Sequence, residues 1–285
     1  MNTWAEASWE PLKGFAQGVR VQRDDLIHAV VSGNKSRKLA GWLRLAREQG
    51  AQRLVSMGGA YSNHMIALAS AASDAGFAAA VYVRGEEERS NLYLDYARSQ
   101  GMEIWPISRE EYRQLRLTGP TQLEPGDLFI PEGGAGQPAY EGFENLVQAW
   151  PSDLEWVLHA SATATTAIGL GKALQKARRN TQVLAVAVLK NANEQRQMIA
   201  AQNLTHVSVW EQAHFGGYAK TPPELLRYWK EAEAKTGLVL DPVYTAKALW
   251  ALEQGLKEQA LTANGMFLHT GGIWGGQSER YRDRV

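Results

Sequence analysis

From about residue 36 onward, short apolar runs alternate with longer segments in which apolar residues recur every three or four positions. The first pattern is typical of buried strands and the second of helices with one buried face, so the alternation predicts an α/β protein with a mostly parallel sheet. Strands are expected at residues 53–57, 79–83, 102–105, 128–130, 155–159, 183–189, 205–209 and 266–269. Helices are expected at residues 36–49, 63–75, 91–100, 140–150, 166–177, 193–202, 223–235 and 245–259.

Glycines and prolines mark where these elements end. Residues 108–137 form the least regular stretch, so we expect them to cross between two lobes. The run PEGGAG at 131–136 is expected to be a surface loop rather than a ligand-binding loop. Glycine suits a left-handed residue just past a helix end, and the expected helices are followed by Gly50, Gly76, Gly101 and Gly237.

Composition excludes several classes of function. The 285 residues include 30 basic and 30 acidic side chains, so no net charge attracts nucleic acid or anionic lipid. The absence of cysteine excludes disulfides, thiol nucleophiles and thiolate metal sites. No apolar run approaches the roughly 18 residues of a membrane span, and the first residues lack the pattern of a secretory signal. We therefore expect a cytoplasmic protein of one large or two modest domains that binds neither nucleic acid, membrane nor metal.

The segment SGNKSRKL, residues 32–39, is the first of four candidate ligand loops. In an open α/β sheet, ligands gather where strands end and helices begin. Lys35 falls in the first turn of an expected helix, with Arg37 and Lys38 close by. Neighbouring cations, the helix N-terminus and burial all disfavour a charged amine, so Lys35 is a candidate for Schiff-base chemistry. A solvated basic surface is the competing interpretation.

The segment GGAYSNHM, residues 58–65, lies between an expected strand and helix. Ser62 or Asn63 can cap that helix, which leaves other N–H groups free for an anion such as a carboxylate. Simple capping is the competing interpretation, and His64 taken singly is more often structural than catalytic.

The segment HASATATTAIGL, residues 159–170, places hydroxyls among small residues before a helix. Ser161, Thr163, Thr165 and Thr166, together with the helix N–H groups, could cradle a phosphate. An ordinary capped helix is equally compatible. The segment matches neither a P-loop nor the glycine fingerprint of dinucleotide-binding folds, which argues against nucleotide binding.

Two further turns, DPVYTAK at 241–247 and LHTGG at 268–272, are unremarkable by themselves. Taken in order with GGYAK and the three loops above, however, they resemble the pyridoxal-phosphate-dependent family of 1-aminocyclopropane-1-carboxylate deaminase and D-cysteine desulfhydrase. This resemblance implies the two-lobed fold of the tryptophan synthase β subunit, with two open, mostly parallel twisted sheets flanked by helices. It places the smaller lobe at residues 38–138, the larger cofactor-binding lobe at 1–37 with 139–285, and the cofactor between them. It also implies a homodimer.

The same resemblance implies a role for each loop. Lys35 would form the Schiff base with pyridoxal 5'-phosphate, and the freed lysine would remove the substrate's α-proton. Asn63 would bind the cofactor's phenolic oxygen, and with Ser62 and His64 it would hold the substrate carboxylate. Tyr218 and Tyr244 would flank the substrate as catalytic residues, and Thr270 would meet the pyridine nitrogen. The cofactor phosphate would be received by the segment Ser161, Ala162, Thr163, Ala164, Thr165 and Thr166.

Two positions favour one activity within the family. Cyclopropane-opening deaminases tend to have a glutamate after DPVY and a leucine at the HTGG threonine, where this chain has Thr245 and Thr270. We therefore expect β-elimination from a small D-amino acid such as D-cysteine, giving a 2-oxo acid, ammonia and sulfide. Ring opening to 2-oxobutyrate is the alternative.

A degenerate, non-catalytic cofactor- or anion-binding protein is an alternative of another class. Its motive is that Ala162 and Ala164 stand where the family's phosphate loop commonly has glycines. Alanine disfavours positive φ, at a cost of about 1 to 3 kcal/mol for a strained residue.

Overall fold

The computed structural model describes residues 7–85, 91–272 and 274. These residues form two compact units, one of residues 35–85 and 91–142, and one of residues 7–34 with 143–272 and 274. The smaller lobe expected at 38–138 lies inside the first unit, and its identity as a functional lobe stays a prediction.

The larger unit is built on a six-stranded sheet that is parallel except at one edge. Only β1 runs antiparallel, against β2. The order across the sheet is β1 (Trp9–Pro11), β2 (Val19–Gln22), β10 (Gly265–Leu268), β7 (Trp156–Ser161), β8 (Gln182–Ala187) and β9 (Val207–Trp210).

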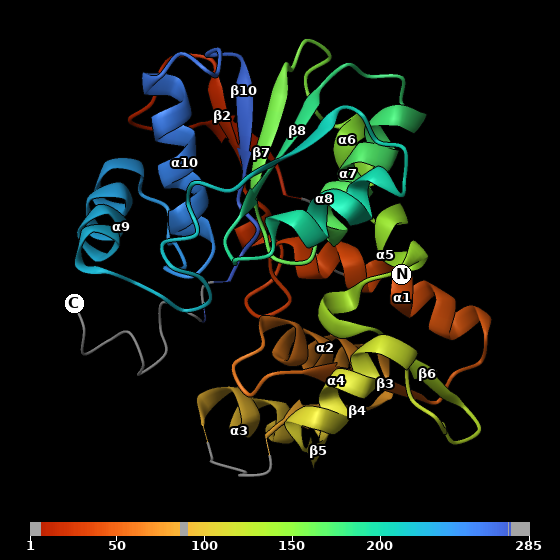
Figure 1. Ribbon diagram of the computed structural model, residues 1–285. Helices are drawn as coiled ribbons and strands as arrows, with labels where there is room; N and C mark the ends of the chain where they lie inside the picture. Colours follow the sequence, from red (N-terminus) through yellow and green to blue (C-terminus); the bar gives the residue numbers. More distant parts are fainter. Residues whose placement is uncertain (1–6, 86–90, 273, 275–285) are drawn as a thin grey trace. The chain divides into compact units, whose positions relative to one another are not determined.

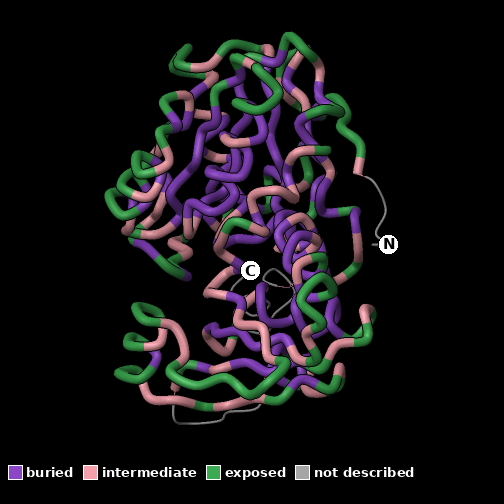
Figure 2. The backbone as a smooth tube through the Cα atoms, turned by 90° about the vertical axis from the view of Figure 1, so that its right-hand side faces the viewer, coloured by how far each residue is buried: buried purple, intermediate pink, exposed green. Residues whose placement is uncertain are grey.

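Helices cover both faces of this sheet (Figure 1). On one face lie α9 (Pro223–Thr236) and α10 (Thr245–Lys257); on the other lie α6 (Glu144–Gln148), α7 (Thr165–Lys176) and α8 (Ala192–Ala200). Alternate strand residues such as Leu158 and Val186 pack against Leu249 of α10 in one hydrophobic cluster. The central strands are buried almost throughout (Figure 2). Because helices cover both faces, we expect ligands to reach the sheet at the carboxyl ends of its parallel strands.

The smaller unit contains a four-stranded parallel sheet in the order β5 (Glu103–Ile107), β4 (Ala78–Arg84), β3 (Arg53–Gly58) and β6 (Asp127–Phe129). Its helices are α1 (Asn34–Glu48), α2 (Asn63–Ala75), α3 (Leu92–Ser99), α4 (Arg109–Thr118) and α5 (Gln137–Glu141), with short 3-10 turns at Asp24–Leu26 in the larger unit and Glu132–Gly134 here. Two mostly parallel sheets with flanking helices confirm the predicted fold class.

Every strand and helix expected from the sequence has a counterpart, but two expectations about the chain's course are wrong, and some short elements were missed. Residues 140–150 form two short helices, because the chain passes between the units at Gly142–Phe143. Residues 108–137 do not cross between lobes; they lie within Lys35–Gly142 and include α4. A capping box between Ser108 and Glu111 starts α4, and this S-x-x-E signal is readable in the sequence. The edge strands β1 and β2 were also missed, since they are short.

Within the described residues, no helix is long and apolar enough to cross a membrane.

Candidate functional site

A loop of small and hydroxyl residues joins β7 to α7 at the carboxyl edge of the larger sheet. Ala164 immediately precedes α7, and the first turn of this helix contains Thr165 and Thr166 but no acidic residue. The first N–H groups of a helix lack intrahelical acceptors and lie at its positive end, so this loop favours an anion. We call Ser161–Thr166 the cradle.

Ala164 adopts φ 55° and ψ −13°, the left-handed conformation that glycine accepts most easily. Ala162 is not among the residues with positive φ. One of the two alanines therefore takes a conformation suited to the glycine it replaces, and the loop keeps that shape at an energetic cost.

Two side-chain amides at the start of α8 hold the cradle in place: partly buried Asn191, which precedes the helix, and buried Gln195 within it. The Ser161 hydroxyl donates to Gln195 Oε1 (2.6 Å), and Gln195 Nε2 donates to Ser161 O (3.4 Å) and to Asn191 Oδ1 (2.9 Å). Asn191 Nδ2 in turn donates to Ala162 O (2.7 Å). Gln195 is completely buried. These four residues, which we call the loop clamp, fix the backbone just before Ala164.

Asn34 links the cradle to the segment that carries Thr270. Its side-chain Nδ2 donates to Thr166 Oγ1 (2.8 Å), and its backbone N–H donates to Thr270 O (3.3 Å). Because Thr166 accepts from Asn34, its own hydroxyl proton is available for a further acceptor. Gly33 is required here, since at φ 63° a Cβ would lie 1.9 Å from Thr270 O. Lys35 is the next residue along the chain from Asn34.

Lys35 and Lys38, near the start of α1, do not form a solvated basic surface. Lys38 is buried and donates to Gly133 O (3.3 Å), whereas Lys35 is partly buried. Burial lowers the pKa of Lys38 well below its usual value, and the charge of Lys35 adds to that effect. The run PEGGAG, expected to be a surface loop, is partly exposed except at one residue. Gly134 is buried, and a Cβ on it would lie 3.3 Å from Cε1 of His64.

His64 is held as a neutral imidazole. Ser56 Oγ donates to Ile130 O (2.7 Å), so it must accept from His64 Nε2 at 3.0 Å, which places the proton on Nε2. Burial, with the charges of Lys35 and Lys38, lowers the pKa of His64 to about 3. Within the described residues, its buried Nδ1 has no hydrogen-bond partner. In this arrangement the imidazole has no N–H left for a carboxylate.

We expect His64 to make the protein sensitive to mild acid. An unfolded histidine has a pKa near 6.5 and the folded one a pKa of about 3, so the unfolded state binds the extra proton between these values. Stability is therefore full above pH 6.5 and falls by up to about 1.4 kcal/mol per pH unit below it. Urea unfolding of His64→Gln should show a shallower loss between those pH values. Identical slopes for both proteins would contradict this assignment.

Ser62 and Asn63 begin α2, as predicted. Ser62 Oγ accepts from the N–H of Met65 (3.4 Å), which confirms capping at this position. The buried Oδ1 of Asn63 has no hydrogen-bond partner among the described residues. An unpaired buried oxygen costs stability, so it suggests a ligand donor absent from the protein chain itself.

Tyr218 and Tyr244 come from segments that meet. Tyr244 packs against the buried pair Ala219 and Val243, and Ala219 directly follows Tyr218. The turn before α10 is fixed by Asp241, whose Oδ1 accepts from the N–H groups of Val243 (2.6 Å) and Tyr244 (2.8 Å). Tyr218 is 49% exposed.

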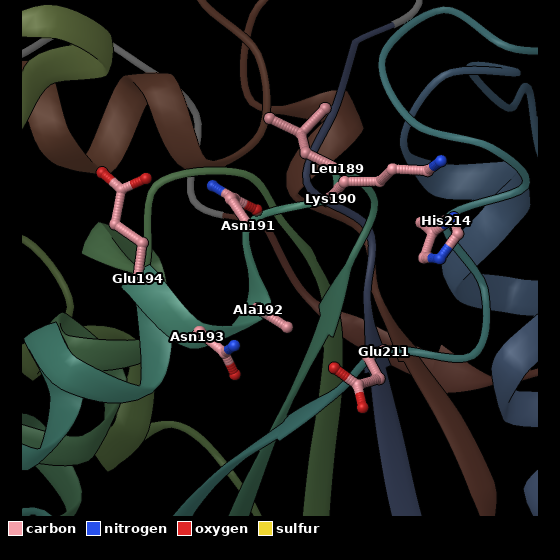
Figure 3. Close-up of a pocket in the computed structure, with 8 residues that line it drawn as sticks. All are labelled: Leu189, Lys190, Asn191, Ala192, Asn193, Glu194, Glu211 and His214. Atoms are coloured by element: carbon pink, nitrogen blue, oxygen red, sulfur yellow. The ribbon is translucent and has the colours of Figure 1, made fainter.

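A pocket of about 400 Å³ opens beside the β8–α8 connection (Figure 3). Lys190 extends toward the side of His214, while Asn191 and Glu194 lie on the other side. Asn191 thus belongs both to this pocket and to the loop clamp. The sequence analysis missed Asn34, Asn191 and Gln195. The four-residue spacing of the last two at a strand-to-helix junction is a signal that could have found them.

Comparisons with known proteins agree with these features. The family model of the pyridoxal-phosphate-dependent enzymes matches residues 9–271. The chain belongs to this family. A protein of Thermotoga maritima provisionally named as a 1-aminocyclopropane-1-carboxylate deaminase is 30% identical, over 92% of this chain and 90% of that one. A D-cysteine desulfhydrase of Yersinia pestis is 27% identical, over 89% and 86%. A solved structure described as an ACC deaminase homologue has a TM-score of 0.76 at 26% identity, covering 90% and 85%.

These matches confirm the tryptophan synthase β-like fold and the predicted cofactor, pyridoxal phosphate. The cradle fits the phosphate of that group. It offers the hydroxyl of Thr166, the first N–H groups of α7 and no carboxylate in the first turn of that helix.

We expect Ala164→Gly to stabilise this enzyme by about 1 kcal/mol, because glycine removes the penalty of a left-handed alanine. Urea unfolding of the two proteins measures the difference. Ala167→Gly is the matched control: Ala167 lies in the first turn of α7 and is completely buried, and glycine there should destabilise by about 0.5 to 1 kcal/mol. A loss of stability in Ala164→Gly would show that the alanine conformation is not strained.

Proposed function

We propose that this enzyme is a lyase that eliminates the β-substituent and the amino group of a small amino acid, with D-cysteine as the first candidate. Bound pyridoxal phosphate withdraws electrons from the substrate's α-carbon and so makes its proton acidic. The chain's own residues then have to bind the substrate, orient it and move that proton.

Lys35 is the proposed attachment and proton-transfer residue. Its Nζ would act as the amine that condenses with the cofactor, since Lys35 lies in the first turn of α1, directly after Asn34, whose side chain donates to the cradle. The amine would accept the proton from the substrate's α-carbon, after which the β-substituent leaves.

The first turn of α2 is the proposed carboxylate site. Its N–H groups at Asn63 and His64 lack intrahelical acceptors, and the hydroxyl proton of Ser62 is free because its oxygen accepts from Met65. The imidazole of His64 would contribute shape rather than a hydrogen bond, since its N–H is used by Ser56.

The residue at position 245 is the main basis for proposing elimination rather than ring opening. Its buried hydroxyl accepts from the N–H of Asp241 (2.6 Å) and donates to Asp241 O (3.4 Å), so it is satisfied inside its own turn. No acidic side chain stands at this position, where the cyclopropane-opening enzymes tend to have a glutamate. Thr270 is proposed to meet the pyridine nitrogen. Its neutral hydroxyl, like the absence of a glutamate at position 245, favours elimination over ring opening.

Ring-opening deamination is the second candidate, because relatives with that provisional name match the chain at 27 to 30% identity. The proposed Tyr218 and Tyr244 would flank the substrate in either case. The homodimer implied by the resemblance also stays a prediction.

A substrate panel separates the two candidates. The purified holoenzyme is incubated with D-cysteine, L-cysteine and 1-aminocyclopropane-1-carboxylate, and sulfide, pyruvate and 2-oxobutyrate are measured. We expect sulfide and pyruvate in equal amounts from D-cysteine. Production of 2-oxobutyrate at the higher kcat/KM would instead favour ring opening. No turnover of any substrate by fully loaded protein would favour the non-catalytic alternative.

A further inference from the structure

The backbone of the segment that contains Tyr218 adopts several unfavourable torsion angles. Phe215 and Ala219 have φ of 49° and 54°, and the two glycines between them have φ of 92° and 114°. Left-handed conformations are unfavourable for residues other than glycine and persist only where their surroundings hold them. The segment from His214 to Lys220 must therefore be held by contacts outside itself.

Lys247 supplies those contacts from α10. It is 0% exposed, and its Nζ donates to the backbone carbonyls of His214 (3.0 Å), Gly217 (3.0 Å) and Val188 (3.4 Å). An ammonium has three N–H donors, so these carbonyls use all of them. The carbonyls of His214 and Gly217 belong to the strained segment, and Val188 directly follows the end of β8.

The charge of Lys247 matches this environment. Three carbonyl oxygens around one positive centre resemble the backbone-carbonyl sites that proteins build for monovalent cations. Burial lowers the pKa of Lys247 to about 8, and the charge of Asp241 opposes that shift, so the amine is mostly protonated at neutral pH.

We propose that Lys247 is a positioning residue that acts as a tethered monovalent cation and fixes the segment 214–220 through three carbonyls. In doing so it presents Tyr218 to the substrate. Only this last step rests on the proposed function; the cation role does not.

Two substitutions at one position test the idea. Lys247→Ala removes the head group and leaves the carbonyls around an empty space that methylammonium can enter. Lys247→Met fills the same space with uncharged atoms and should not respond to that cation. Lys257→Ala is the control, because Lys257 is an exposed lysine at the end of the same helix.

The main measurement is amide hydrogen exchange in the holoenzyme. The N–H of Gly217 donates to His214 O (2.9 Å) and that of Lys220 to Gly217 O (3.3 Å), so both report on the segment. In Lys247→Ala we expect these amides to exchange at least about tenfold faster, equivalent to about 1.4 kcal/mol of local stability. Methylammonium chloride should restore the slow exchange, whereas tetramethylammonium chloride at equal ionic strength should not. Lys257→Ala should exchange like the wild type.

Unchanged exchange in Lys247→Ala, or equal responses of Lys247→Ala and Lys247→Met to methylammonium, would overturn the proposal. If Lys247→Ala is too unstable for exchange, the same comparison is made on its melting temperature, with the same two outcomes. The consequence for Tyr218 is measured by steady-state kinetics of Lys247→Ala. The factor by which KM for the substrate rises should be about tenfold larger than the factor by which kcat falls. Because exchange needs no substrate, a failure of the proposed D-cysteine activity leaves the cation test intact.

Discussion

Lys35→Ala should lose catalytic turnover by about 10³-fold or more, while the protein remains folded. The reason is that this amine is proposed both to bind the cofactor covalently and to move the α-proton, and proton transfer alone contributes about 10² to 10⁴ to the rate. Lys35 is only partly buried, so alanine leaves no large cavity. The measurement is product formation from the best substrate of the panel, with circular dichroism as the check on folding.

Peptide mapping after borohydride reduction makes this prediction specific. The wild-type holoenzyme should carry the reduced cofactor on Lys35, and Lys35→Ala should carry none. Lys38 is the stringent comparison, because burial holds the pKa of its amine below the usual value. Label on Lys38, or unchanged turnover in Lys35→Ala, would reject the assignment. Lys176→Ala, at an exposed lysine of α7, should behave like the wild type.

Gln195→Ala should cause the second largest effect, a loss of cofactor retention by about 10- to 100-fold. The substitution leaves the buried Ser161 hydroxyl without its partner, at about 1 to 3 kcal/mol, and also removes the donor to the partly buried amide oxygen of Asn191. The backbone of the cradle would then no longer be held in the shape proposed to bind the phosphate. Retention is measured as cofactor content after gel filtration, and affinity by titration of the apoprotein.

Gln197→Ala is the matched control for Gln195→Ala, because Gln197 lies two residues further along α8 and is exposed. It should keep the wild-type cofactor content. If both variants lose cofactor equally, the effect belongs to the helix as a whole rather than to the loop clamp.

The elements were largely predictable from the sequence, because periodicity records which faces are buried. The course of α2 was predicted to the residue, since Ser62 caps it and Gly76 ends it in a left-handed conformation. The position of α4 was not predicted, although its capping box was readable. Proline and glycine on the C-terminal side of that box obscured a local signal that had a definite mechanism.

The candidate site was less predictable, since its supporting contacts join residues far apart in the chain. Gln195 lies 34 residues from Ser161, and Asn34 lies 132 residues from Thr166. No local pattern specifies such pairs; they follow from strand order, which brings β7 beside β8. The neutral state of His64 was similarly hidden, because it depends on Ser56 and on burial rather than on its neighbours in sequence.

The left-handed alanine before α7 also bears on how distant relatives of this enzyme are recognised. A search pattern that demands glycines in the phosphate loop would pass over this chain, even though the backbone retains one of the torsion angles for which glycine is selected. Torsion angles, together with the distant amides that enforce them, are thus a better criterion of descent than the letters of the loop.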